Sequence, residues 1–120
     1  MKKLFLHWLP VFLYSSLIFY LSSRSDVHAE HDKIAHTAAY TVLCLLFLWA
    51  LRLHVKSLPA LLLFAVLLTT FYGVGDEYHQ SFVPGRESSI YDVMADFLGS
   101  MLGVTFYVLA TRFSKHKSPA

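Results

Sequence analysis

Four long segments with almost no charged residues constrain the fold of this chain more than any other feature. They cover residues 4–21, 34–51, 58–75 and 90–110. An α-helix rises about 1.5 Å per residue, so 18 residues reach about 27 Å, close to the ~30 Å hydrocarbon core of a bilayer. Each segment is therefore long enough to cross a membrane as a single helix.

The composition supports this interpretation, because 56% of the 120 residues are hydrophobic and only 15% are charged. A soluble domain of this size exposes a large share of its surface and could not bury four such segments. We therefore predict an all-α integral membrane bundle of four transmembrane helices, formed as a single domain by residues 1–120. The composition excludes a soluble enzyme and a nucleic-acid-binding protein, and it makes the lipid bilayer the first expected partner.

Basic residues are distributed unequally over the two sides of such a bundle. With four spans, both termini lie on one side together with the short loop 52–57, and this side carries seven of the ten basic residues and no acidic residue. The opposite side and its adjoining helix ends carry Arg24, Lys33, Arg86 and all eight acidic residues. Because an excess of Lys and Arg marks the cytoplasmic side, we predict that both termini are cytoplasmic and that the acidic loops face outward.

Polar residues recur at helical spacing near the outward ends of the segments. Residues three, four or seven apart share a helix face, and the third span should extend over 58–80 because the first stop signal after it is Val83-Pro84-Gly85. The aligned polar residues are Lys33, His36 and Tyr40 in the second segment, Asp76, Glu77 and Gln80 in the third, Asp92 and Asp96 in the fourth, and the weaker set Ser16, Tyr20 and Ser23 in the first. We expect these stripes to form one outward-facing polar site.

Asp92 and Asp96 carry the most information about this site. A carboxylate within a span costs roughly 2.5–3.5 kcal/mol on insertion scales, so it should face the bundle interior with a partner. Candidate partners are Lys33, His36 and Arg86. Asp92 lies near the start of its helix, where the helix dipole favours an anion, so Asp96 is the stronger indication. Two interpretations stay open: an ionic staple that holds the helices together, and a functional site.

Two glycine-containing patterns indicate local structure around the site. The pair Pro84-Gly85 predicts a tight turn that would fold the loop back over the bundle and place Arg86 above Asp92. Gly99 and Gly103 are four residues apart, and this spacing allows a neighbouring helix to approach closely.

The chain contains no complete catalytic motif such as a His-Glu-x-x-His zinc pair, a Gly-x-Ser-x-Gly nucleophile or a phosphate loop. We assign catalytic acid–base roles to His36, Glu77 and Asp96, because an imidazole and carboxylates in different environments can divide these roles. Substrate-binding roles are assigned to Lys33, Tyr40, Asp76, Gln80, Arg86 and Asp92. Ligands for a divalent metal ion are available from His36, Asp76, Glu77, His79, Asp92 and Asp96. Neither a metal requirement nor an oligomeric state follows from the sequence.

These polar residues lie in short stretches that resemble the VanZ-like family of small bacterial membrane proteins. The matching stretches are Leu21-Ser22-Ser23, Asp32-Lys33-Ile34-Ala35-His36 with Tyr40, Asp76-Glu77-Tyr78-His79-Gln80, Pro84-Gly85-Arg86 with Ser89 and Asp92, and Gly99 with Gly103. Since the founding member is associated with low-level teicoplanin resistance, the resemblance implies a multi-pass protein of the bacterial cytoplasmic membrane with a role in the cell envelope. Asn is usual in the family at the position of Asp96, so the resemblance carries over no role for that residue.

Three functions are compatible with this site. The first is an envelope enzyme that modifies a lipid-linked or phosphate-bearing component at the outer leaflet, with Arg86, Lys33 and His36 holding the phosphate. Glu77 or Asp96 would then act as a base or hold a metal. The second is a non-catalytic accessory module that recognises a lipid head group, a glycopeptide or a partner protein. The third is a small four-span transporter, which we rank last because the first and third segments have no carboxylate near mid-membrane.

Overall fold

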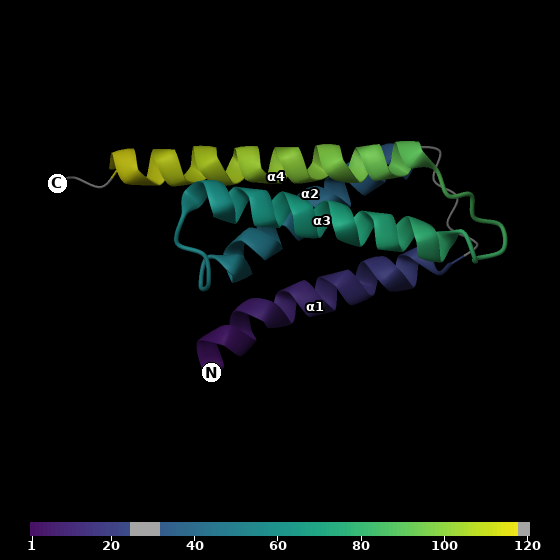
Figure 1. Ribbon diagram of the computed structural model, residues 1–120, viewed down its shortest axis with the longest axis horizontal. Helices are drawn as coiled ribbons and strands as arrows, with labels where there is room; N and C mark the ends of the chain where they lie inside the picture. Colours follow the sequence, from purple (N-terminus) through teal and green to yellow (C-terminus); the bar gives the residue numbers. More distant parts are fainter. Residues whose placement is uncertain (25–31, 118–120) are drawn as a thin grey trace.

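A computed structural model of the chain describes residues 1–24 and 32–117 (Figure 1). These residues form four α-helices and no strand: α1 (Lys2–Ser22), α2 (Asp32–Leu51), α3 (Leu58–Gln80) and α4 (Ile90–Lys117). Each helix is long and apolar enough to cross a membrane, so the predicted all-α bundle of four transmembrane helices is confirmed. Asp26 and Glu30, two acidic residues of the first predicted outward loop, lie outside the described residues.

The helix bounds follow the predicted spans closely, with one exception at the C-terminal end. α3 covers the predicted residues 58–80, whereas α4 continues to Lys117, beyond the predicted end at residue 110. The apolar pattern marks where a helix leaves the bilayer, but the helix itself can continue into water. Its last turn contains Lys115, His116 and Lys117, and the positive charges of the two lysines interact favourably with the negative end of the helix dipole.

All four helices run roughly along the long axis of the bundle. Figure 1 shows the start of α1 and the end of α4 toward one end of the bundle, while the end of α1, the start of α2 and the connection from α3 to α4 lie at the other end. We call this second end the site end, because the predicted polar residues lie there. The most extensive contact joins α2 and α4, α3 packs against both, and α1 contacts α2 and α3.

Two glycines of α4 allow the close contact with α2. A Cβ atom added at Gly99 would lie 2.6 Å from the carbonyl oxygen of Thr37, and one added at Gly103 would lie 2.8 Å from the Cβ of Cys44. Both distances are shorter than van der Waals contact, so only glycine fits without moving a helix, as the spacing predicts. The hydroxyl of Thr37 also donates a hydrogen bond across this contact, to the carbonyl of Ala95 at 3.3 Å.

Two tyrosine hydroxyls tie α1 to the other helices. Tyr14 donates to the carbonyl of Ala39 in α2 at 3.0 Å, and Tyr72 of α3 donates to the carbonyl of Ser15 in α1 at 2.5 Å. Hydrogen bonds between helices stabilise membrane bundles because lipid tails offer no competing partner. These two bonds position α1, which forms one wall of the pocket described below.

The buried residues change in character along the bundle axis. Near the termini the core is apolar and includes Leu48, Ala50, Leu51, Leu61 and Ala65. At the site end the buried polar residues are Ser22, His36, Asp76, Glu77, Gln80, Asp92 and Asp96. The polar stripes predicted for the second, third and fourth segments therefore do face the interior, with the exception of Lys33, which is exposed.

The loop between α3 and α4 folds back in the predicted tight turn. Gly85 has a φ of 81°, and the N–H of Arg86 donates to the carbonyl of Val83 at 3.1 Å. Pro84 and Gly85 thus occupy the central positions of a turn with type II character, in which the second central residue needs a positive φ. This turn brings Arg86 back toward the helices.

Candidate functional site

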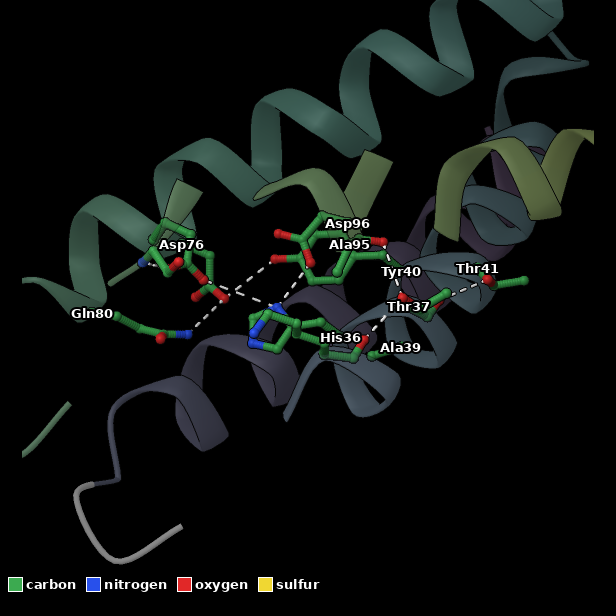
Figure 2. Close-up of polar contacts among 12 residues, drawn as sticks. His36, Thr37, Ala39, Tyr40, Thr41, Asp76, Gln80, Ala95 and Asp96 are labelled. Atoms are coloured by element: carbon green, nitrogen blue, oxygen red, sulfur yellow. Dashed lines mark hydrogen bonds and ion pairs between the residues drawn. The ribbon is translucent and has the colours of Figure 1, made fainter. Parts of the chain in front are cut away.

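One side chain from each of α2, α3 and α4 meets in a buried group at the site end. Nδ1 of His36 lies 2.8 Å from Oδ1 of Asp96 and 4.0 Å from Oε1 of Glu77. Figure 2 shows the contact between His36 and Asp96. Asp96 is completely buried, and His36 and Glu77 expose only 8% and 5% of their surface. We call these three residues the buried cluster, and they are the three to which the sequence assigns acid–base roles.

Asp76 forms a second polar group beside the buried cluster. Its Oδ2 accepts hydrogen bonds from the hydroxyl of Tyr40 at 3.2 Å and from Nε2 of Gln80 at 3.4 Å (Figure 2). The ring of Tyr40 lies parallel to the ring of His36, with 6.0 Å between the ring centroids. Tyr40 therefore connects Asp76 to the buried cluster, and the stripes predicted on α2 and α3 face each other.

Glu77 is oriented by the start of α4. The backbone N–H of Ser89 donates to Oε2 of Glu77 at 3.2 Å, while Oε1 lies on the side of His36. Ser89 acts as the N-cap of α4, because its hydroxyl oxygen accepts the N–H of Tyr91 at 3.2 Å. This contact is not among the sequence predictions. Ser89-Ile90-Tyr91-Asp92 has the spacing of a helix-start signal, which could have indicated the N-cap but not its contact with Glu77.

Asp96 occupies space that Gly73 leaves open. A Cβ atom added at Gly73 would lie 2.6 Å from Oδ2 of Asp96, whereas one added at Gly75 would meet nothing within 4 Å. The sequence places Gly73 on the same face as Asp76, but it does not show why a glycine is needed there. The structure does: the backbone of α3 at Gly73 is the surface on which the Asp96 carboxylate rests.

Three carboxylate oxygens at the site end have no hydrogen-bond partner among the described residues. They are Oδ1 of Asp76, Oε1 of Glu77 and Oδ2 of Asp96. A buried polar atom without a partner costs about 1–3 kcal/mol, and more when it is charged. In an ionic staple each of these oxygens would be paired. Oxygens that are available to bind a proton, a cation or a polar ligand are more typical of a binding site.

A pocket of about 150 Å³ adjoins the buried cluster between α1, α2 and α3. Its polar lining consists of Ser22, His36, Tyr40, Asp76, Gln80 and Arg86, and its apolar lining of Ile18, Leu21, Ala35 and Ala39. Because a water molecule occupies about 30 Å³ of liquid, the pocket can hold several waters or a group the size of a phosphate. Leu21 and Ala35 are exposed, so the pocket is reached from the surface between α1 and α2.

Arg86 enters this pocket from the loop between α3 and α4. Its Nη1 donates to the carbonyl of Arg24, just after α1, at 3.5 Å. Arg86 shares the pocket with Asp76 and Gln80. The loop therefore folds back over the bundle as predicted, and its arginine joins the residues to which the sequence assigns substrate binding.

Lys33 and Asp92 are both predicted to bind substrate, but Lys33 is exposed and Asp92 is buried. Lys33 is exposed, and its Nζ lies 5.7 Å from the ring centroid of Tyr91. It lines a separate groove between α2 and α4, lined also by Thr41 and Leu98, and does not line the pocket. Asp92 is buried in the first turn of α4, one turn before Asp96 on the same face, as predicted.

His79, a candidate metal ligand in the sequence, points toward α1 instead of the buried cluster. Its ring stacks on Phe19 with 4.2 Å between the centroids, and its Nε2 lies 2.9 Å from the hydroxyl of Ser23. The physical reason is helical geometry, because two residues advance about 200° around a helix of 3.6 residues per turn. His79 and Glu77 therefore face different neighbours.

α1 contributes a different serine from those predicted. Ser16 and Tyr20 are exposed, whereas Ser22 is buried and lines the pocket. The buried residues of this helix are Val11, Ile18 and Ser22. Their spacing of seven and four residues defines one helix face, and this pattern is the signal that could have identified Ser22.

The fold and the site define a class: a multi-pass membrane protein with four transmembrane helices and a buried ionisable site at one end of the bundle. The chain matches the VanZ/LLP1 family over residues 3–111 and belongs to that family. It is also 29% identical over 79 residues to an uncharacterized protein of Schizosaccharomyces pombe, an alignment that covers 66% of this chain and 48% of the relative. The chain thus spans about half the length of this relative. No solved structure matches the chain.

Proposed function

We propose that this protein binds a phosphate-bearing lipid of the bacterial cell envelope in the pocket at its site end and acts on it at the outer leaflet of the cytoplasmic membrane. The observation that carries the proposal is the lining of the pocket. Apolar residues of α1 and α2 form one part of it, and His36, Gln80 and Arg86 belong to the other. A lipid presents the same combination, an apolar chain joined to an anionic head group.

Arg86 supplies the anion-binding group of the proposed site. Its guanidinium is planar, always charged and able to bind two phosphate oxygens at once. It lies on the loop at the end of the bundle, which is the depth at which head groups of a bilayer are found. The amide of Gln80, almost completely buried at 1% exposure, adds a hydrogen-bond donor deeper in the pocket.

The pair of His36 and Asp96 supplies the proposed chemistry. A carboxylate 2.8 Å from a ring nitrogen fixes the orientation of an imidazole and stabilises its protonated form, which prepares it for general acid–base catalysis. His36 also lines the pocket, so a bound head group would lie next to it. The reaction class that this arrangement supports is hydrolysis of a phosphate ester, in which His36 would take a proton from the attacking water as the new P–O bond forms and return a proton to the leaving oxygen as the old P–O bond breaks.

The small pocket favours a lipid over a glycopeptide as the ligand. A glycopeptide antibiotic such as teicoplanin is far larger than about 150 Å³. Tolerance of teicoplanin would then be a consequence of altered envelope lipids. A lipid ligand is also compatible with the relative in a yeast, because phospholipids are present in both kinds of organism.

A transport function finds less support. The core near the termini is formed by apolar residues such as Leu48, Leu61 and Ala65. Beyond the site end, the buried polar residues among the described ones are Thr69 and Ser100, neither of which is ionisable. The site has the character of a pocket at one membrane face.

Native mass spectrometry of the detergent-purified protein with phosphatidylglycerol tests this function. We expect the wild type to retain the lipid and Arg86→Gln to bind it about tenfold more weakly, a loss of about 1.4 kcal/mol. Arg112→Gln is the matched control, because Arg112 is exposed near the other end of α4. Equal binding by Arg86→Gln and the wild type would contradict the proposal, as would equal binding of diacylglycerol, which lacks the phosphate.

A further inference from the structure

The buried cluster contains the ligand types of a metal site at a suitable spacing. We infer that His36, Glu77 and Asp96 together bind one divalent transition-metal ion. Each residue offers one nitrogen or oxygen atom, and these atoms all lie within 4.8 Å of one another. The three come from three different helices, so an ion would join α2, α3 and α4. A bound ion would take the place of the hydrogen bond between His36 and Asp96 that the proposed function uses, and the two proposals can fail separately because the test of the ion uses no lipid.

The distances fit an ion after small side-chain movements. Ligand atoms about 2.0–2.2 Å from a metal ion lie about 3–3.6 Å from one another. The separations from Nδ1 of His36 are 2.8 Å to Asp96 and 4.0 Å to Glu77, which bracket that range. All three ligand atoms lie within 4.8 Å of one another, so side-chain rotation without movement of the helices would place them around one ion.

An unpartnered oxygen points into the cluster. Oε1 of Glu77 has no hydrogen-bond partner among the described residues, and it lies on the side of His36. The other oxygen of the same carboxylate accepts the N–H of Ser89 at 3.2 Å. Hydrogen bonds of this kind orient a metal-binding carboxylate and leave its second oxygen for the ion.

Charge balance supports a divalent ion in particular. Ionised Glu77 and Asp96 would place two negative charges in a buried site, and charges within a membrane protein need a partner. Neutral His36 is a ligand but adds no positive charge. A divalent cation bound by the three residues would make the net charge of the cluster zero, a balance that a monovalent ion would not reach.

The donor set favours a transition metal over Ca²⁺. Calcium takes six to eight oxygen ligands, whereas one imidazole and two carboxylates suit zinc and its neighbours. Three protein ligands also leave a fourth position for water or for an oxygen of a ligand, as in catalytic zinc sites. Because His36 lines the pocket, that position can be reached from there.

Zinc binding to the purified, chelator-stripped full chain in detergent tests the inference, with a chromophoric zinc chelator as competitor. We expect one Zn²⁺ per chain, and an affinity at least about tenfold lower in Glu77→Gln and Asp96→Asn. Glu87→Gln and His79→Ala are matched controls, because Glu87 is exposed and His79 contacts α1. Absence of stoichiometric binding, or equal affinity in the ligand variants and the wild type, would overturn the inference.

A second pair of variants leaves the three ligand residues themselves unchanged. Gly73→Ala would push the carboxylate of Asp96 away, while Gly75→Ala adds a methyl group that meets nothing within 4 Å. We expect weaker zinc binding only in Gly73→Ala.

If the ligand variants fail to fold, X-ray absorption at the zinc edge of the wild type decides the question. The inference requires a first shell of nitrogen and oxygen with one imidazole. A sulfur ligand, which would indicate the buried Cys44, would overturn it.

Discussion

The two ends of the bundle are held together in different ways. Near the termini, buried residues such as Leu48 and Leu61 are apolar, and the helices meet mainly through apolar packing, with a hydrogen bond from Nε1 of Trp8 to Nε2 of His54 at the edge. At the site end, the same helices bury His36, Glu77 and Asp96. A charge within a span costs roughly 2.5–3.5 kcal/mol on insertion scales. Burying the residues of the site end in the membrane therefore requires more free energy than burying those near the termini.

The difference indicates where function resides. Replacing a buried ionic group by well-packed apolar residues is often neutral or stabilising, by about 1–4 kcal/mol. The end near the termini shows that these helices can pack through apolar contacts. Among the described residues, oxygens at the other end such as Oδ2 of Asp96 have no hydrogen-bond partner. The ionisable residues there are therefore better explained by a ligand than by stability.

The largest effect that we predict is an all-or-none difference in labelling between the two ends. On a Cys44→Ala background, Ser88→Cys in the loop after α3 should react with a membrane-impermeant maleimide added to intact cells. Ser57→Cys before α3 should not react, because the basic residues on its side mark it as cytoplasmic. The opposite labelling pattern would place the site at the cytoplasmic face and would contradict action at the outer leaflet.

Next in size is the effect of separating α2 from α4. Gly99→Ala puts a methyl group 2.6 Å from the backbone oxygen of Thr37, which cannot move without shifting a helix. We expect a loss of about 1–3 kcal/mol, seen as less folded protein and a lower thermal midpoint in detergent. Gly75→Ala is the matched control and should be neutral. If both variants behave alike, close helix contact is not what assembles the site.

A smaller effect is expected when the charge of Arg86 is kept and its shape is changed. Arg86→Lys retains one positive charge but loses the planar fork that binds two oxygens. Phosphatidylglycerol binding should fall severalfold, by about 1 kcal/mol, while the amount of folded protein stays near that of the wild type. Wild-type binding by Arg86→Lys would mean that only the charge matters at this position.

The smallest effect concerns the wall of the pocket that α1 provides. Tyr72→Phe removes the hydrogen bond to the carbonyl of Ser15, and interhelical hydrogen bonds in membranes contribute on average about 0.6 kcal/mol. We expect a small drop in the thermal midpoint and little change in zinc binding, because α1 contributes no residue to the buried cluster. A large loss of zinc binding would show that α1 supports the cluster as well as the pocket.

Much of the fold follows from the sequence. The length of each apolar segment predicts a membrane-spanning helix, and the helical repeat of 3.6 residues predicts which side chains share a face. His36 with Tyr40 and Asp92 with Asp96 are buried as their spacing predicts. The C-terminal end of α4 is not predicted correctly, because a helix can continue beyond its apolar segment. The orientation of the termini remains a prediction from charge.

The site was harder to predict, because spacing gives a helix face but not the neighbour that the face meets. Lys33 shares a stripe with His36 yet lies at the edge of the buried face, over Tyr91. The spacing of Val11, Ile18 and Ser22 gives the buried face of α1, but that this face meets the pocket depends on how α1 packs against α2 and α3. The hydrogen bond from Ser89 to Glu77 likewise depends on how the loop returns.

The buried cluster is either a functional site or an ion-pair network that only holds the helices together. Comparing folding and function in the same variants distinguishes the two most directly. His36→Ala, Glu77→Gln and Asp96→Asn would each be scored for folded protein in membranes and for teicoplanin tolerance of the cells. We expect folded protein to stay near the wild-type amount while tolerance is lost. Loss of folded protein in proportion to lost tolerance in all three variants would contradict it and identify the cluster as a staple.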